Sequence, residues 1–578
     1  MTIYTITVLL SVLAYIAVGN YAGRKVKGLE DYFVVGRQAP TILIVGTLVA
    51  SFLSTNTFLG EAGLVYGFVA GGRILGPSLV VAGYIYGALY FGRYLRRSRS
   101  LTVAQYFADR FDSRRVQVIA GITVFVGIGF YLIAVTQGVA VILSDLTALS
   151  YRQGLIVAWA SYTSFTLYSG SRGVVLTDTM MFFLFSTITV AAMLFIFDEH
   201  GGWVASVGKL TFLQEKPSLM TWHGMVGPGE RWETPAEFLI WLIIIGIAWS
   251  FVTAISPWQS SRYLMAKDEH VVLRSACIAG IAIPLIQTMV YAAAVTVNLS
   301  DANIVPKERA LIWAAQYIIP PLFGALVIAG LVAAALSSAT TFLSLIGFNV
   351  SNDIIQFKHT KPENQLKFSR QMMLMVSIIA LVVCLSIEQE LFWLTYFAGT
   401  IFASAWGPVA FMSVWSDRIT ASAAFWGITT GFLGNAIPKL FVTMGLLKLP
   451  VYMDPVLIGA VISLSVVIIV SLNTEVTEKE RTYRLHLLKT PEEEFNDKAT
   501  NKTVKFGFAL IIFGIVKAAI LVYFYVVPYF RALHPTGQML AKDWWSGEAW
   551  FAYSWSILYG ILGCLVVFGV RKFYRQQS

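Results

Sequence analysis

The chain of 578 residues is far more apolar than a soluble globular protein. Hydrophobic residues make up 57% of it and charged residues only 13%, and the mean hydropathy is +0.69. This composition excludes soluble and disordered proteins and predicts an all-α integral membrane protein. The formal net charge of +10 is explained by loop topology and contact with anionic lipids, so no nucleic-acid partner is expected.

Neither cysteine nor histidine indicates a metal centre or an enzyme. Cys277, Cys384 and Cys564 all lie in apolar stretches and form no CxxC pair, so no disulfide framework is expected. The six histidines fall in polar connections or at their edges. The polar segment 473–505 has mixed charges and no glycine-rich phosphate cradle, which indicates a solvated connector.

Apolar stretches that could cross a bilayer recur along the whole chain. A spanning helix needs about 18 or more largely apolar residues to cross ~30 Å of hydrocarbon, and about fifteen stretches satisfy this rule. The first has no basic residues before it, so we expect a retained anchor and not a cleaved signal peptide. The stretches lie near 4–21, 40–68, 74–91, 116–143, 153–168, 173–197, 236–257, 275–297, 311–345, 371–387, 391–414, 420–441, 455–472, 506–528 and 549–570.

Lysine and arginine predict the orientation of the chain in the membrane. Most of the 42 basic residues fall in alternate connections, such as GRKVKG after the first stretch, GRYLRRSRS after the third and RKFYRQQS at the end. The positive-inside rule then places the N-terminus outside and the C-terminus in the cytoplasm. We expect a multi-pass protein of the cell inner (plasma) membrane, in contact with its lipids.

Polar residues interrupt the second stretch at SFLSTNT, residues 51–57. Five polar side chains in seven residues are too costly for a lipid-facing helix, so the helix there should be buried or broken. Glu61 follows in the same stretch, either as a functional carboxylate or in a wet outer vestibule. Arg73 is expected to snorkel at the outer entrance of the third stretch.

Three further polar residues lie inside apolar stretches. Gln137 could line a pathway or tie two helices together. Asp178, in LTDTMMF, is either a solvated cap or an intramembrane charge with a cation near it. Lys517 is expected to snorkel or to make a helix contact.

A second interruption occurs where Ser250, Thr253, Ser256 and Pro257 divide IGIAWSFVTAISPWQSSRYLMAKDE. Two interrupted helices five spans apart indicate an inverted repeat whose broken helices meet at the bilayer midplane. The expected organisation is an N-terminal anchor span and cytoplasmic loop at 1–38, a first five-helix repeat at 39–198, an outer loop and second repeat at 199–414, and peripheral C-terminal helices at 415–578.

A cluster of hydroxyls stands in the apolar segment GLVAAALSSATTFLSL, residues 330–345. Ser337, Ser338, Thr340 and Thr341 fall within five residues, which is costly in hydrocarbon unless they face a helix, a cavity or an ion. We expect this segment to bind sodium, because a hard cation is bound by several oxygens. Asp353, further along, is expected to meet cytoplasmic water.

Four motifs in order resemble the sodium:solute symporter family, which has the inverted-repeat fold of the leucine transporter LeuT. They are ASFLSTNTFLG, LTDTMMF, PWQSSRYLMAKDE and AAALSSATTFLSL, and the resemblance covers roughly residues 1–470. It implies a LeuT-like 5+5 inverted repeat with one extra N-terminal helix and about four extra C-terminal helices.

The resemblance also implies two sodium sites. The first would use backbone carbonyls of Ala50, Leu53 and Ala334 and the hydroxyls of Ser337 and Ser338. The second, as in the sialic acid transporters of the family, would use Asp178 with Ser337, Thr340 and Thr341.

The substrate is less well defined by the resemblance. Phe52, Thr57 and Gly76 replace the amide and carboxylate side chains of sugar-carrying relatives, and proline transporters have an aspartate matching Phe52. Sialic acid transporters bind a carboxylate through hydroxyls that match Ser54 and Thr57, although their substrate-binding arginine has no clear counterpart. The expected substrate-binding residues are Ser54, Thr57, Gln137, Trp249 and Thr253.

The sequence thus predicts a sodium-coupled symporter that imports a small, carboxylate-bearing organic solute by alternating access, with one or two sodium ions and as a functional monomer. A membrane sensor or scaffold that binds solute without transport, and a symporter for a sugar or neutral solute, are the alternatives. A proton-pumping subunit would need ionisable residues repeated at mid-membrane, and only Glu61 and Lys517 come close.

Overall fold

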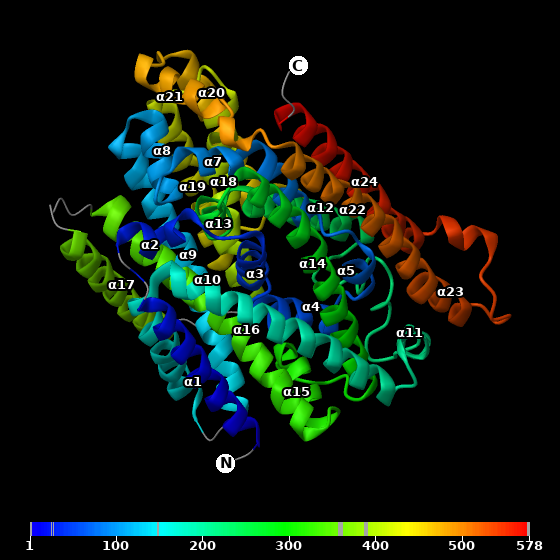
Figure 1. Cartoon of the computed structure of the whole chain (residues 1–578). Helices are drawn as coiled ribbons and strands as arrows, with labels where there is room; N and C mark the ends of the chain where they lie inside the picture. Colours follow the sequence, from blue (N-terminus) through cyan, green and yellow to red (C-terminus); the bar gives the residue numbers. More distant parts are fainter. Residues whose placement is uncertain are drawn as a thin grey trace.

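The computed structural model describes residues 3–24, 26, 28–146, 149–355, 362–386 and 391–574, and within these ranges it is all-helical and has no strands (Figure 1). The first part of the chain contains α1 Ile3–Gly23, α2 Leu29–Val34, α3 Thr41–Phe52, α4 Ala62–Gly67, α5 Gly71–Leu75, α6 Ala82–Gly87, α7 Arg93–Ser98, α8 Val103–Phe111, α9 Arg114–Leu146, α10 Tyr151–Glu199 and α11 Trp203–Thr211. The rest contains α12 Pro235–Ile255, α13 Pro257–Met265, α14 Glu269–Thr296, α15 Ala310–Tyr317, α16 Pro321–Phe348, α17 Pro362–Cys384, α18 Leu391–Trp415, α19 Ala421–Thr443, α20 Pro455–Leu472, α21 Glu478–Leu488, α22 Asp497–Leu521, α23 Val527–Leu533 and α24 Gly547–Tyr574.

Twelve helices of the described residues are long and apolar enough to cross a membrane, or thirteen if the bent pair formed by Thr41–Phe52 and Asn56–Gly67 is one span. The expected stretches outside this set are 153–168, which forms the first part of α10, and 420–441, which forms most of α19. All fifteen stretches are therefore largely helical, while the count of fifteen spans stays a prediction.

Both predicted interruptions are confirmed as breaks in helices. The first separates α3 from a π-helix at Asn56–Glu61, η2, and the chain bends there by 48°. The second lies at Ser256, whose ψ of 146° ends α12 directly before Pro257 begins α13. Proline at the first position of a helix lacks an N–H that would be unpaired there, so the second helix restarts at little cost.

The helix that carries the hydroxyl cluster, α16, is deeply enclosed by the rest of the molecule. In the most apolar 18-residue segment of this helix, 83% of the residues are buried inside the molecule. It packs against α9, α10, α1 and α17, and also contacts α3 at the break. The hydroxyls therefore face protein, as expected for polar groups at membrane depth.

The C-terminal helices α22 and α24 form a long pair on one side of the molecule, where α22 also packs against α14 (Figure 1). Lys517 of α22 makes a helix contact and does not reach the bilayer surface. Its Nζ donates to the Pro284 carbonyl at 2.9 Å and the Thr288 hydroxyl at 2.8 Å, and it stands 3.5 Å from the ring centroid of Trp555. These contacts satisfy a buried cation without a carboxylate.

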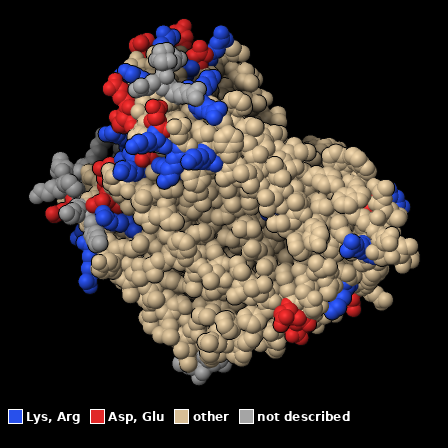
Figure 2. Space-filling model, turned by 45° about the vertical axis from the view of Figure 1, so that its right-hand side comes forward, with Lys and Arg blue, Asp and Glu red and all other residues tan. Residues whose placement is uncertain are grey.

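Charged residues gather at one end of the molecule. Figure 2 shows Lys and Arg concentrated towards its upper end, where Figure 1 places α7, α8 and α21, above a broad uncharged surface. The two termini lie at opposite ends, which fits an odd number of crossings. The assignment of the basic end to the cytoplasm stays a prediction.

The prediction that Asp353 meets cytoplasmic water is wrong. Asp353 lies in the π-helix Asn349–Ile354, η7, and is 0% exposed. Its Oδ1 accepts hydrogen bonds from Thr102, Gln117 and Asn352 at 2.7–2.8 Å. Because Thr102 caps α8 and Gln117 belongs to α9, this carboxylate joins the start of both helices to the end of α16.

Gly170 divides α10 into two helical parts, and its conformation generates a stability prediction. Its φ of 54° is in a region that L side chains rarely adopt, and an added Cβ would lie 2.7 Å from the Tyr32 carbonyl oxygen. We expect Gly170→Ala to lower the free energy of unfolding by about 2–4 kcal/mol through strain and overcrowding. Thermal unfolding of the detergent-solubilised protein measures the effect.

Gly129 of α9 provides the matched control, because an added Cβ there meets nothing within 4 Å. Gly129→Ala should leave the unfolding temperature unchanged or raise it, since alanine favours a helix over glycine by about 1 kcal/mol. Equal effects of the two substitutions would contradict a specific role for the bend at Gly170.

Candidate functional site

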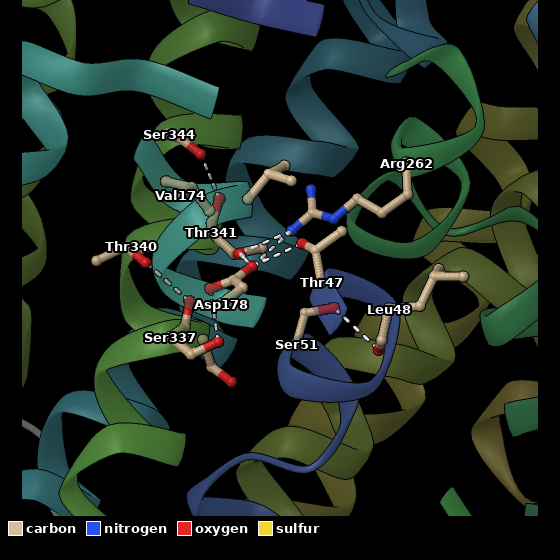
Figure 3. Close-up of polar contacts among 12 residues, drawn as sticks. Thr47, Leu48, Ser51, Val174, Asp178, Arg262, Ser337, Thr340, Thr341 and Ser344 are labelled. Atoms are coloured by element: carbon tan, nitrogen blue, oxygen red, sulfur yellow. Dashed lines mark hydrogen bonds and ion pairs between the residues drawn. The ribbon is translucent and has the colours of Figure 1, made fainter. Parts of the chain in front are cut away.

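Asp178 is the centre of a buried polar cluster formed by side chains of α3, α10, α13 and α16 (Figure 3). The carboxylate is 0% exposed. It accepts hydrogen bonds from Thr47 at 2.6 Å, from Ser337 at 2.7 Å and from Thr341 at 3.4 Å. Three separate elements, α10, α3 and α16, therefore meet at one carboxylate.

Arg262 of α13 completes this cluster from the opposite side. Its Nη2 lies 3.9 Å from Asp178 Oδ2 and donates to the Thr341 hydroxyl at 2.7 Å. Both charged side chains are almost fully buried, with side-chain exposures of 2% for the arginine and 0% for the aspartate. The sequence left open whether Asp178 is a solvated cap or an intramembrane charge beside a cation, and the structure places it beside a cation.

The four hydroxyls of α16 divide in their contacts. Ser337 and Thr341 donate to Asp178, whereas Ser338 donates to the Ala334 carbonyl of its own helix at 3.3 Å. Thr340 donates to the Ser337 carbonyl at 2.9 Å. The structure thus brings Asp178, Ser337 and Thr341 of the predicted second sodium site together, with the hydroxyl of Thr340 turned back to its helix.

The break after α3 releases the two backbone carbonyls expected in the first sodium site. In a regular helix the amide of Ser54 would pair with Ala50, and that of Thr57 with Leu53. Instead, the Ser54 amide donates to the Phe52 carbonyl at 2.9 Å and the Thr57 amide to the Ser54 carbonyl at 3.0 Å. The Ala50 and Leu53 carbonyls are left without these helical partners, which suits a cation.

A cavity of about 50 Å³ opens beside the same break. In the same measure one water needs about 10–15 Å³, so the cavity has room for a few heavy atoms. Its wall includes Phe52 directly at the break and Trp249 of α12, whose rings meet edge to face at 6.3 Å. The other lining residues are Asn56, Glu61, Gly72, Arg73, Gly76, Pro77, Ser78, Leu79, Val80, Leu242, Ile245, Gly246, Gln287, Tyr291, Phe392, Thr395 and Tyr396.

Glu61 and Arg73 form an ion pair at this cavity. Arg73 Nη2 lies 3.4 Å from Glu61 Oε1, and the same nitrogen donates to the Tyr291 hydroxyl at 3.0 Å. The other carboxylate oxygen accepts from Gln287 at 3.0 Å and from Tyr291. Both charged side chains line the cavity, and Arg73 is paired with Glu61 there.

The remaining substrate candidates are buried and are not part of the cavity wall. Ser54 accepts a hydrogen bond from the Asn56 amide at 3.2 Å, and Thr253 donates to the Val80 carbonyl at 2.7 Å. Thr57 and Gln137 are 1% and 3% exposed. Of the five predicted substrate-binding residues, Trp249 is the one that lines the cavity.

Sequence reasoning did not identify Thr47 and Arg262 as part of the site. Thr47 stands about one turn before Ala50 on the same helix. This spacing could have placed its hydroxyl near the predicted sodium sites. Arg262 lies in the motif PWQSSRYLMAKDE, but the sequence contains nothing to show that α13 points this guanidinium at Asp178. Among the described residues, no group of three His, Cys, Asp or Glu side chains could hold a metal.

Comparisons with known proteins agree on one family. A model of the sodium:solute symporter family matches residues 32–431. The sodium/proline symporter of Escherichia coli is 22% identical over 77% of this chain and 89% of its own length. The sodium/pantothenate symporter of Escherichia coli is 21% identical over 75% of this chain and 85% of its own length.

Solved structures agree on the fold. A sodium-coupled sialic acid symporter in a substrate-bound outward-open state has a TM-score of 0.67, with 20% identity over 83% of this chain and 99% of that one. A transporter of the nucleobase-cation-symport-1 family has a TM-score of 0.51, with 12% identity over 79% of this chain and 98% of its own. The chain therefore has a LeuT-like fold.

The Asp178–Arg262 pair generates a coupling prediction. Arg262→Gln leaves a buried carboxylate without its cation, and Asp178→Asn leaves a buried guanidinium without its anion, each costing about 3–5 kcal/mol of stability. The double variant removes both charges, so it should lose less than the sum of the single variants by at least ~1 kcal/mol. Thermal unfolding of all four proteins gives this difference, and additive losses would show that the two side chains do not interact.

Proposed function

Because the chain belongs to the sodium:solute symporter family, whose members are transporters and not enzymes, we propose that it imports a small, carboxylate-bearing organic solute with sodium by alternating access. The observation that carries this proposal is the break after Phe52. It frees two carbonyls from helical pairing, beside Phe52 of the cavity wall and at the end of a helix that contacts α16.

The first sodium ion binds between α3 and α16 in this proposal. The carbonyls of Ala50, Leu53 and Ala334 and the hydroxyls of Ser337 and Ser338 supply five neutral oxygens, a donor set that suits a hard monovalent cation. Phe52 stands between the two α3 carbonyls in sequence and lines the cavity. Filling either site therefore affects the backbone that forms the other, which supports coupling of ion and solute.

The second sodium ion is assigned to Asp178, Ser337, Thr340 and Thr341. In the structure the Asp178 carboxylate is already bonded by three hydroxyls and faced by Arg262. A sodium ion at this position therefore requires the guanidinium to move away, and Thr340 to turn from the Ser337 carbonyl. Arg262 acts as a tethered cation that holds the site in the absence of the ion.

The energetics support accumulation of solute. Each sodium ion that enters across about 100 mV releases roughly 2.3 kcal/mol, and a tenfold concentration gradient adds about 1.4 kcal/mol. Two ions per solute would double both contributions.

The chemistry of the relatives supports a carboxylate on the solute. Proline, pantothenate and sialic acid, the solutes in the names of the relatives, all carry one. The aromatic and aliphatic wall formed by Phe52, Trp249 and Ile245 gives few partners for the many hydroxyls of a sugar. The protein acts in the cell inner membrane as a monomer surrounded by lipid in this proposal.

Uptake into proteoliposomes tests sodium coupling. Uptake should require an inward sodium gradient, and Ser338→Ala should raise the sodium concentration for half-maximal uptake by about 10-fold, because it removes one cation ligand at nearly constant volume. Ser344→Ala is the matched control on the same helix, since that hydroxyl donates to the Thr341 carbonyl at 2.8 Å. Equal uptake with all sodium replaced by potassium would rule out symport.

The sodium-to-solute ratio tests the second ion. We expect the wild-type protein to move two sodium ions per solute and Asp178→Asn to move one, because the amide lacks the charge that attracts the ion. Reversal potentials of proteoliposomes at set gradients measure the ratio. Asp353→Asn, which changes a buried carboxylate away from this cluster, should keep the wild-type ratio; an unchanged ratio in Asp178→Asn would refute the second site.

A further inference from the structure

The net charge of the ion pairs at the cavity and at the Asp178 cluster favours an anionic solute. Asp178 pairs with Arg262, and Glu61 pairs with Arg73, so each of these two ion pairs is neutral. The proposed first sodium site has neutral ligands only. One bound sodium ion therefore adds a positive charge in a medium where unpaired charge is costly, and a solute with one negative charge offsets it.

Within the cavity, Arg73 is the group with unused hydrogen-bonding capacity. Glu61 Oε2 already accepts two hydrogen bonds, from Gln287 and Tyr291. A guanidinium has five N–H donors, yet the ion pair of Arg73 with Glu61 is long at 3.4 Å and its Nε is buried without a partner. A buried donor without a partner costs about 1–3 kcal/mol, which an incoming acceptor recovers.

The rest of the wall determines which acceptor fits. Phe52, Trp249, Leu79 and Ile245 give the cavity apolar surface, and Glu61 and Arg73 are the acidic and basic side chains among its lining residues. The fork of a guanidinium matches the two oxygens of a carboxylate. The cavity therefore suits a ligand with a carboxylate at one end and a small apolar body at the other.

We propose that Arg73 binds the carboxylate of a small monocarboxylate whose apolar body contacts Phe52 and Trp249, and that Glu61 and Tyr291 position the guanidinium. This inference rests on the proposed sodium-coupled uptake and adds the residue that recognises the solute.

Thermal stabilisation of the purified full-length protein tests the assignment. The probes are the linear monocarboxylates from acetate to hexanoate and their primary amides, each with sodium and with potassium as the cation. A ligand that binds only the folded state raises the unfolding temperature. We expect at least one carboxylate to stabilise the protein in sodium, and its amide to need about 10- to 100-fold higher concentration for the same shift.

Variants locate the recognition at Arg73. Arg73→Gln should remove the preference for the carboxylate over the amide. The double variant Glu61→Gln/Arg73→Gln should do the same, and because it leaves no unpaired carboxylate in the cavity it serves as a check in case the single variant misfolds. Arg309→Gln is the matched control, because Arg309 pairs with Asp145 and does not line the cavity. It should retain the preference.

The outcomes separate this inference from the proposed function. If sodium alone stabilises the protein more than potassium but no carboxylate in the series binds better than its amide, the assignment of Arg73 is wrong and sodium binding stands. A preference that survives in both Arg73 variants also refutes it. If sodium and potassium act equally throughout, the proposed function fails as well.

Discussion

Backbone carbonyls released at the break in α3 must find partners inside a bundle embedded in hydrocarbon, where water is scarce. A helix that crosses a membrane satisfies its own backbone, and a break is tolerated only where protein or a polar cavity replaces the lost hydrogen bonds. In this chain the break faces α16 and the cavity at Phe52. The buried α16, which contacts α3, supplies hydroxyl oxygens to this region.

The buried charges near the break must also be neutralised, because an unpaired charge is costly away from water. The buried charges at Asp178 and Glu61 each have an arginine partner from another helical element. Pairing keeps these two sites neutral in the absence of ions, which limits the cost of burying four charged side chains. In the proposed function, a sodium ion at the first site adds a positive charge that an anionic solute offsets.

Two other buried charged side chains, Asp353 and Lys517, hold helices together away from the site. At one end Asp353 gathers three hydrogen bonds on a single oxygen and ties η7 to α8 and α9. At the side, Lys517 holds α22 against the proline of α14 and the ring of Trp555. Of the helix pair α22 and α24, α22 packs against α14, which carries Gln287 and Tyr291 to the cavity. Its partner α24 contacts α5, which carries Arg73.

The sequence by itself determined the membrane class, the long apolar helices and both helix breaks. Of the three α16 hydroxyls that the resemblance placed at Asp178, Ser337 and Thr341 donate to it and Thr340 does not. Apolar length, polar interruptions and hydroxyl spacing are local properties, and a bilayer forces local patterns into helices. Only the tertiary structure decided the partners: Arg262 at Asp178, Arg73 at Glu61, and burial in place of hydration at Asp353. Each of these contacts joins side chains more than ten residues apart whose helices must first pack, and packing orientation depends on the summed shape of many side chains that no single motif contains.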